Sequence, residues 1–569
     1  MYQDPPQLQN QWRDDRTLRA LLRRTLPRDV LHDVEPSLDR MGALAAGELY
    51  ELAVAHRLDE PVHVPFDAWG RRIDEVRLNP AWREYARVAA REGLVATGYE
   101  RQHGAFSRLH QFALVYLFDR SSQVYTCPLA MTDGCARTLE LLGPAAVRER
   151  VLPRLLSRDP DTVWTSGQWM TERIGGSDVG LSETVARNED GVWRLYGTKW
   201  FTSAVTSQVA LTLARPEGNG PGGKGLALFF VEARDAAGRL QRITVDRLKE
   251  KLGTKLLPTA ELTLDGTLAI PLAGLSNGVR QIATMLNLTR TWNAVCSAAS
   301  LRRGLALARD YARRRFAFGM MLSEKPLHLD TLSVLAAEQE AALQLAFYAV
   351  TLLGREEAGE LDDAGHATLR LLQPIAKLTT ARMAVDGASE AIEAFGGAGY
   401  LEDSGLAELM RDTHVLPIWE GTTNVLAVEA ARAIRRADAL KPFLAQVTAH
   451  AGLARHPLLT APAHAARAAA EHAASFWSDA VRRGPVLFEA ELRRFSLTLG
   501  RSLALALLVA QAQWALDEEG DARSAAAARR FAASGVDLLQ DAPQPAAASL
   551  ALALDEPLSP FETDEVVET

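Results

Sequence analysis

The feature that most constrains the fold is a change in hydrophobic patterning near residue 164 and a second change near residue 279. Before the first point and after the second, apolar residues recur at three- and four-residue spacing, which indicates amphipathic helices. Between the two points lie short runs of β-type residues, separated by loops rich in Gly, Pro, Asn and Asp. These runs cover residues 192–196, 209–214, 226–231, 243–245 and 262–264. The pattern predicts a compact antiparallel β unit between two helical regions.

A chain of 569 residues is too long for one hydrophobic core, so we expect several domains. The longest helical patterns, at 300–316, 331–353 and 367–395, are typical of a helix bundle. The predicted segments are an N-terminal arm and α-helical domain at 1–160, a middle β domain at 161–280, a helical bundle at 281–440, an additional helical domain at 441–540 and an acidic, disordered tail at 541–569.

Charge, cysteine usage and hydropathy exclude several classes of protein. The net charge of -8 gives the whole molecule no electrostatic footprint for nucleic acid. Three cysteines are too few for a disulfide framework, no spacing indicates a metal site, and the first residues lack the apolar run of a secretory signal. The most apolar stretches, 342–354 and 503–516, are shorter than a membrane span and are interpreted as core helices. We therefore expect a cytoplasmic protein with neither metal nor membrane.

Two glycine motifs have misleading spacing. Residues 218–223 satisfy the dinucleotide-binding glycine pattern, but they lie between two β-type runs, so a hairpin loop is the favoured interpretation. Residues 274–278 fit the nucleophile elbow of α/β-hydrolases, with strand-like and helix-like neighbours. The surrounding chain lacks the alternation of strands and helices which that fold requires, so we give the elbow little weight.

Four separated segments form a more specific constellation. They are Met170-Thr171-Glu172 with Gly175-Gly176-Ser177-Asp178, then Gly197 to Ser203, then Thr289-Arg290 with Arg315-Phe316-Ala317-Phe318-Gly319, and finally Glu393 to Tyr400 with Trp419-Glu420-Gly421-Thr422-Thr423-Asn424. Each alone has an ordinary reading as a capped loop, core packing or a solvated helix end. Together, in this order and spacing, they resemble the signatures of the acyl-CoA dehydrogenases. The resemblance implies an N-terminal α-helical domain, a middle antiparallel β-barrel or sandwich, a C-terminal four-helix bundle and bound FAD.

By this resemblance, FAD contacts come from all four segments. The implied residues are Met170, Thr171, Gly176, Ser177, Phe201, Ser203, Arg315, Phe318, Glu393, Gly396, Gly397, Thr422 and Asn424. Phe201 would stack on the flavin and the Ser203 hydroxyl would reach its edge near N5, although a one-residue slip would give these roles to Trp200 and Thr202. Arg315 would meet the pyrophosphate of an FAD bound mainly to a neighbouring subunit, which implies a homo-oligomer, a dimer of dimers.

Glu420 falls where most family members carry the catalytic base. The resemblance implies that it removes the α-proton of an acyl-CoA thioester while a hydride leaves the β-carbon for flavin N5. A carboxylate beside flavin and Trp419 is desolvated, which raises its proton affinity towards that of a general base. Thr289 occupies the position where other members place their base, and threonine cannot serve. The implied substrate contacts are Ser177, Arg290, Trp419 and Gly421.

Some features depart from the common pattern. Glu393 replaces a glutamine near FAD, Pro326 falls near another expected glutamine, and Trp419 stands where many members have tyrosine. With the extended N-terminal arm and the extra C-terminal domain, these departures look most like the AidB branch, the bacterial alkylation-response flavoproteins. That branch implies a homotetramer, weak dehydrogenase activity and duplex DNA binding through the extension.

Two functions therefore stay open. One is FAD-dependent α,β-dehydrogenation of acyl-CoA, with electron-transfer flavoprotein or another protein as electron acceptor. The alternative is a flavoprotein that binds duplex DNA through residues 441–536, with vestigial turnover. That segment carries eleven Lys/Arg against eight Asp/Glu, including Arg pairs at 482–483, 493–494 and 529–530, whereas 537–569 carries eight acidic residues and no basic one. On charge alone, a solvated helix surface is the simpler reading of these pairs.

Overall fold

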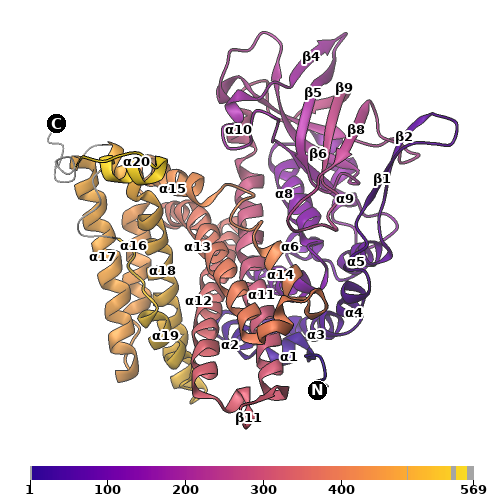
Figure 1. The fold of residues 1–569 in the computed structure, drawn as a ribbon. Coiled ribbons are helices and arrows are strands. Elements are labelled where there is room, and N and C mark those ends of the chain that lie inside the picture. The colour runs from indigo at the N-terminus through magenta and orange to yellow at the C-terminus, as the bar shows by residue number, and fades with distance from the viewer. Residues whose placement is uncertain (1–2, 484, 540–545, 560–569) are drawn as a thin grey trace. The chain divides into compact units, whose positions relative to one another are not determined.

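The chain forms two compact units in a computed structural model that describes residues 3–483, 485–539 and 546–559 (Figure 1). The first unit comprises Met1–Leu361 and Thr380–Gly421, and the second comprises Asp362–Thr379 and Thr422–Thr569.

The first unit begins with a helical arm and layer. Its helices are α1 (Gln11–Asp14), α2 (Arg16–Thr25), α3 (Arg28–Ala46), α4 (Glu48–Ala55), α5 (Pro80–Arg91), α6 (Ala96–Glu100), α7 (Ser107–Phe118), α8 (Thr126–Leu142) and α9 (Ala145–Leu155). Helix α5 shows why these segments are helical: Asn79 caps the N–H of Trp82, Pro80 occupies the first turn, and Trp82, Tyr85 and Val88 bury one face.

A β-hairpin interrupts this helical layer, which the sequence did not predict. Strands β1 (Val62–Phe66) and β2 (Arg72–Arg77) pair antiparallel. The side chain of Arg72 donates to the carbonyl of Val245 at 2.8 Å, and the Asp74 carboxylate accepts from the Val245 N–H at 3.3 Å. The hairpin is therefore held by strand β8 (Ile243–Leu248) of the middle domain, a contact that no local pattern encodes.

The middle of the chain forms a small β-barrel. Its strands are β3 (Ser166–Trp169), β4 (Val185–Glu189), β5 (Val192–Thr202), β6 (Val209–Pro216), β7 (Ala227–Glu232), β8 (Ile243–Leu248) and β9 (Ala260–Pro271). Strands β6, β4, β5, β9 and β7 close a ring, with β3 added on β6 and β8 on β9. Leu195, Phe229 and Leu262 belong to its buried core.

The barrel confirms all five predicted runs and refines their pairing. Most pairs are antiparallel as expected, but β6 pairs parallel with both β3 and β4. Residues 218–223 lie in the connection between β6 and β7, which pair antiparallel, so the hairpin interpretation is confirmed. Residues 274–278 follow β9, whose partners are antiparallel. This is not the parallel sheet on which a nucleophile elbow sits.

Long helices follow the barrel. They are α10 (Gly278–Gln281), α11 (Ala283–Arg314), α12 (Pro326–Glu357), α13 (Asp363–Phe395) and α14 (Leu406–Thr413), with the small hairpin β10 (Phe316–Ala317) and β11 (Met320–Met321) between α11 and α12. Helix α11 packs on α12, α7 and α8. It is the element on which the helical layer and the candidate site are both built.

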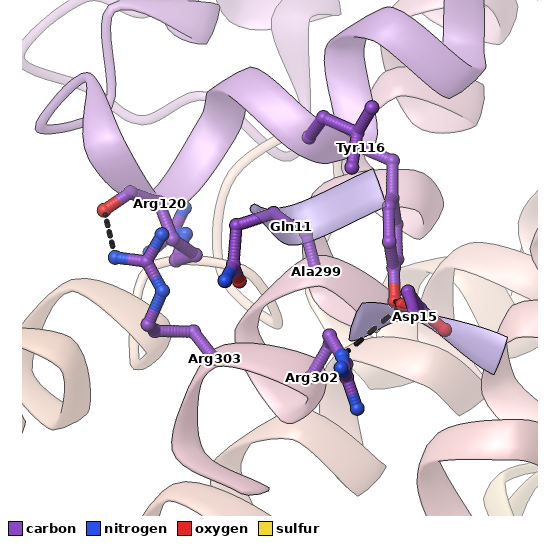
Figure 2. Close-up of a pocket in the computed structure, with 8 residues that line it drawn as sticks. Gln11, Asp15, Tyr116, Arg120, Ala299, Arg302 and Arg303 are labelled. Carbon is purple, nitrogen blue, oxygen red and sulfur yellow. Dashed lines mark hydrogen bonds and ion pairs between the residues drawn. The ribbon is translucent and has the colours of Figure 1, made fainter. Parts of the chain in front are cut away.

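Buried arginines fasten the N-terminal arm to α11, around the small cavity in Figure 2. Arg302 lies 3.1 Å from the carboxylate of Asp15, which also accepts from the Tyr116 hydroxyl at 2.9 Å. Arg303 donates to the Ser121 hydroxyl, and burial lowers the pKa of Arg303 to about 10. The cavity has room for a water-sized particle, and polar cavities of this size ordinarily hold water.

The secondary structure of the second unit is all helical in its described part. It contains α15 (Thr423–Ala437), α16 (Leu440–Ala451), α17 (Thr460–Arg483), α18 (Pro485–Glu518), α19 (Arg523–Ala533) and α20 (Ala546–Leu554), together with the first half of α13. Helices α15, α16, α17 and α19 all pack on α18. Helix α20 lies inside the segment 541–569, for which the sequence predicted disorder and no helix.

Helix α18 is apolar enough to attract comparison with a membrane span. Residues Phe488–Glu518 contain a window of mean hydropathy 1.5, of which 89% is buried inside the protein. The apolar stretch is longer than the predicted 503–516. Its burial among other helices nevertheless confirms the interpretation of that stretch as a core helix.

Candidate active site

Glu420 lies in the turn between α14 and α15, with its carboxylate held from two distant elements. Thr289, on α11, donates its hydroxyl to Oε2 at 2.7 Å. Gln168, on β3, donates its amide to Oε1 at 3.3 Å. Arg290 Nε donates to the backbone carbonyl of Glu420 at 3.2 Å. The first unit thus brings together the predicted base, the predicted substrate contact Arg290, and two residues to which the sequence assigned no role in holding the base.

The backbone at Glu420 is strained. Its φ of 56° lies in the left-handed region, and Gly421 follows with a φ of 101°. A non-glycine residue there costs about 1–2 kcal/mol. Side-chain and backbone hydrogen bonds from α11 and β3 hold the residue in this conformation.

The Met170-Thr171-Glu172 segment is anchored to β5 through a buried ion pair. Lys199 Nζ lies 2.8 Å from Glu172 Oε1, and the two side chains are 0% and 2% exposed. Burial would raise the pKa of Glu172, but the Lys199 ammonium and hydrogen bonds from Thr184 and Glu183 outweigh it and lower the pKa. Burial lowers the pKa of Lys199, which Glu172 offsets only in part. The ion pair therefore links the first sequence motif, which contains Glu172, to the second, which contains Lys199.

The loop that carries Gly176 and Ser177 turns back on Thr171. A Cβ at position 176 would lie 2.5 Å from the Thr171 hydroxyl, so the turn needs glycine there. The Trp200 N–H donates to the Thr171 carbonyl at 2.9 Å, which sets this loop beside the aromatic pair of β5. Ser177 is exposed.

The geometry of β5 separates the two alternative phases of its motif. Thr202 is buried and donates its hydroxyl to the Ala260 carbonyl at 2.7 Å, and the Trp200 ring is covered by Lys249 Nζ, 3.1 Å from its centroid. Phe201 is 48% exposed, and Ser203 is only partly buried. Phe201 on β5 and Ser203 directly after it are therefore more exposed than Thr202, which favours this phase over Trp200 and Thr202.

The sequence reasoning missed Gln168, Lys251 and Cys127. Gln168 lies on β3, two residues before Met170, and its amide Nε2 lies 3.6 Å from the Met170 sulfur, so its nearness in sequence to the first motif was a usable signal. Lys251 Nζ donates to Thr259 Oγ1 at 3.0 Å, and that hydroxyl lies 3.2 Å from Ser203 Oγ. Burial lowers the pKa of Lys251 to about 8 and raises that of Cys127 to about 12. No motif marked these two residues.

Arg315 and Phe318 lie at the other end of α11. Thr289 and Arg315 are separated by roughly 40 Å of helix at 1.5 Å per residue. Phe318 is 95% exposed and Phe316 is 51% exposed, on a short hairpin with a left-handed residue at Phe318. Within one chain this hairpin is remote from Glu420, and exposed aromatic clusters of this kind are typical of contacts with another chain.

The glycine-rich segment after α13 has two glycines with a structural reason, one steric and one conformational. A Cβ at Gly399 would lie 2.3 Å from the Ile392 carbonyl, whereas Gly396 and Gly397 face open space. Gly396 has a φ of 60° and ends the helix. Glu393 is exposed on the last turn of α13.

Thr422 and Asn424 belong to the second unit and already have protein partners. The Thr422 hydroxyl accepts from the Val425 N–H at 3.3 Å and so caps α15. Asn424 Oδ1 accepts from Arg493 of α18 at 3.0 Å. One arginine of the predicted DNA-binding pairs is thus directed at a predicted cofactor residue. Its neighbour Arg494 pairs with Glu491 at 2.5 Å, and the side chains of 482 and 483 lie outside the described residues.

Two buried polar atoms near Glu420 make no hydrogen bond within the described part of the protein. Gln168 Oε1 and Trp419 Nε1 are buried atoms without a hydrogen-bond partner. Such atoms are rare in folded proteins unless a ligand or water meets them. With the outward-facing Phe201, these residues fit a polar, planar cofactor beside Glu420. Among the described residues, no cluster of His, Cys, Asp or Glu could hold a metal ion.

Helix α14, which leads to Glu420, carries an acidic pair that makes stability depend on pH. Burial and the Asp412 carboxylate raise the pKa of Glu408 to about 8. An acid whose pKa is raised by folding contributes its full stability below its unfolded pKa. This contribution is lost as the pH rises through its pKa in the folded protein. We expect Glu408→Gln to raise the free energy of unfolding by roughly 1–3 kcal/mol at about pH 9, with little gain at about pH 5.

Denaturant titrations at the two pH values measure this effect. Glu402→Gln is the matched control, because Arg411 lowers the pKa of Glu402 and its stabilising contribution is present above its unfolded pKa. Equal gains from Glu408→Gln at both pH values would contradict the prediction.

Comparison with known families gives three consecutive matches. Residues 3–162 match the adaptive response protein AidB N-terminal domain, 167–267 the acyl-CoA dehydrogenase middle domain, and 276–435 the acyl-CoA dehydrogenase C-terminal domain. The predicted fold class is confirmed: an N-terminal helical domain, a middle β-barrel, C-terminal helices and extra helices beyond the matched domains.

Individual relatives agree with these matches. The chain is 44% identical to acyl-CoA dehydrogenase family member 11 of Caenorhabditis elegans, over 76% of this chain and 71% of that protein. It is 32% identical to the putative acyl-CoA dehydrogenase AidB of Escherichia coli, over 71% and 74% respectively. The crystal structure of Caenorhabditis elegans ACDH-11 in complex with C11-CoA superposes with a TM-score of 0.91 at 38% identity, covering 95% of this chain and 93% of that one.

Proposed function

Because the chain belongs to the acyl-CoA dehydrogenase family, we propose that it catalyses FAD-dependent α,β-dehydrogenation of an acyl-CoA thioester with Glu420 as the base. One observation carries the proposal. At the position where the family places its base, this chain has a carboxylate that receives hydrogen bonds on both oxygens and stands beside unpartnered polar atoms of Gln168 and Trp419.

The chain's own residues have distinct proposed tasks. Glu420 takes the α-proton on a carboxylate oxygen, and Arg290 fixes its backbone carbonyl, which also orients the peptide units of the turn. Ser177, Trp419 and Gly421 line the acyl-CoA, and Phe201 and Ser203 face the flavin. Bound FAD supplies the hydride acceptor. The remaining proposed FAD contacts are Met170, Thr171, Gly176, Arg315, Phe318, Glu393, Gly396, Gly397, Thr422 and Asn424.

The test is a screen for anaerobic flavin bleaching by acyl-CoA. The relative whose structure contains C11-CoA makes a medium-length acyl chain the first choice, followed by short, branched and longer chains. We expect purified protein to contain FAD and at least one acyl-CoA to bleach it. Protein that stays colourless after incubation with excess FAD would contradict the proposal.

Assembly, location and electron acceptor form part of the same proposal. We propose a cytoplasmic homotetramer. Arg315 and Phe318 lie too far along α11 to reach the Glu420 end of their own chain, which supports their contact with the FAD of a neighbouring chain. The proposed acceptor is electron-transfer flavoprotein or another protein. Light scattering of the parent and of Phe318→Ser would test whether the exposed hairpin contributes to the assembly.

Duplex DNA binding through 441–536 is the second candidate, and local charge gives it limited support. Arg494 pairs with Glu491 and Arg455 with Asp517, so part of the basic charge is already neutralised. Binding driven by phosphate contacts would weaken steeply with salt. A gel shift at two salt concentrations, with the full chain and with 537–569 removed, tests it. Absence of a shift at low salt in both proteins would eliminate this function.

A further inference from the structure

The hydrogen-bond partners of Glu420 can serve it in two protonation states. A catalytic base changes its needs during the reaction, because a carboxylate only accepts hydrogen bonds whereas a carboxylic acid must also donate one. A partner suited to only one state would oppose the proton transfer. The chemistry of Thr289 and Gln168 therefore decides whether they merely hold Glu420 or also accommodate the proton it receives.

Thr289 has two acceptors within reach of one hydroxyl proton. Its Oγ1 lies 2.7 Å from Glu420 Oε2 and 3.0 Å from the Leu286 carbonyl, one turn back on α11. While Glu420 is charged, the shorter charge-assisted bond takes the proton. Once Glu420 is protonated, the hydroxyl can turn to Leu286 and accept the new O–H. Thr289 is 4% exposed, so water does not readily replace it.

Gln168 has the same dual capacity through its amide. Its Nε2 lies 3.3 Å from Glu420 Oε1, and its own Oε1 is buried without a hydrogen-bond partner. Turning the amide over would present that oxygen to a protonated Glu420. A leucine or methionine at this position would fill similar space but could neither donate nor accept with comparable strength.

Resting on the proposed function, we propose that Thr289 and Gln168 are positioning residues that keep Glu420 hydrogen-bonded both before and after it takes the substrate's α-proton. In that step the C–H bond at the α-carbon breaks and an O–H bond forms on Glu420. The electron pair left on carbon would form the double bond as the β-hydride departs to the acceptor that bound FAD would supply. Thr289 and Gln168 exchange no electrons and contact only the base.

The test compares hydroxyl deletions on one helix. Thr289→Val removes the hydroxyl beside Glu420, and Thr289→Ser keeps it. Thr291 lies two residues after Thr289 on α11 and donates its buried hydroxyl to the Asn287 carbonyl. Thr291→Val removes this hydroxyl. For each holoenzyme the rate of flavin bleaching is measured against pH. The bond to charged Glu420 is charge-assisted and stronger than the bond to protonated Glu420. We therefore expect Thr289→Val to move the acidic limb of the pH–rate profile about one pH unit higher, which lowers the rate about tenfold on that side.

Two control variants and one companion variant complete the test. Thr289→Ser and Thr291→Val should keep the parental limb, and Gln168→Met should shift it in the same direction as Thr289→Val by a smaller amount, because the bond is longer. An unmoved limb in Thr289→Val, or an equal shift in Thr291→Val, would overturn the proposal.

A second readout needs neither cofactor nor substrate. A double-mutant cycle of Thr289→Val and Glu420→Gln is measured on the free energy of unfolding at several pH values. Coupling that changes with pH supports the pairing of Thr289 with an ionisable Glu420, and additivity at every pH contradicts it. If none of the acyl-CoAs bleaches the flavin of the parent, the proposed reaction is wrong. The double-mutant cycle still tests whether Thr289 is hydrogen-bonded to an ionisable Glu420.

Discussion

Glu420→Gln is expected to bind FAD and acyl-CoA like the parent while losing about 10²–10⁴-fold in the rate of flavin bleaching. The amide keeps the volume of the carboxylate and can still pair with Thr289 and Gln168, so the left-handed turn should survive. It cannot take a proton from carbon. Anaerobic stopped-flow absorbance at saturating acyl-CoA measures the rate, and the visible spectrum of the purified protein gives the FAD content.

Two companion variants sharpen this result. Glu420→Asp retains a base but withdraws it by one methylene, so its rate should lie between those of the parent and Glu420→Gln. Glu390→Gln makes the same chemical change at an exposed position on α13 and should leave the rate unchanged. Parental bleaching by Glu420→Gln would assign the proton transfer to another residue.

Lys199→Met is expected to lower the free energy of unfolding by about 3–5 kcal/mol. The substitution leaves the Glu172 carboxylate buried, with the Thr184 hydroxyl at 2.6 Å but no cation beside it. The Leu213 carbonyl also loses the Lys199 ammonium, a donor 2.8 Å away. Because this ion pair ties the Met170-Thr171 loop to β5, the variant should also release FAD more readily. Denaturant unfolding and FAD retention on gel filtration measure the two effects.

The matched comparisons separate burial from charge. Adding Glu172→Gln to Lys199→Met removes the uncompensated charge and should recover part of the loss. Arg13→Met breaks an ion pair with Asp39 in which the arginine side chain is 72% exposed, and it should cost far less stability than Lys199→Met because solvent screens the pair. Equal losses for Lys199→Met and Arg13→Met would show that the buried pair has no special weight.

The sequence was most informative where structure follows from local pattern. Five of the seven barrel strands were found from their β-type residues and the turn residues between them, whereas β3 and β4 were missed because they are short and polar or glycine-containing. The parallel pairing of β6 and the β1–β2 hairpin depend on distant partners, which no local period encodes. Helix α20 shows that an alanine- and leucine-rich stretch can be helical inside a tail of disordered composition.

The candidate site divides in the same way. Motif order identified Glu420, but its hydrogen-bond partners Thr289 and Gln168 lie 131 and 252 residues away in the chain. The choice between Phe201 and Trp200 required the burial of Thr202, which the strand pattern alone left open. Lys251 became visible only through its bond to Thr259 beside Ser203.

The strained backbone at position 420 also affects which residues are expected there when no base is needed. Glycine or asparagine would relax there, so random drift and screens for heat resistance should both favour replacing the glutamate. A lineage that no longer needs proton abstraction has no reason to resist that replacement. If Glu420 is the base, as proposed, the strained acid at this turn is kept for proton transfer, and family members that no longer abstract a proton should carry glycine or asparagine at this position.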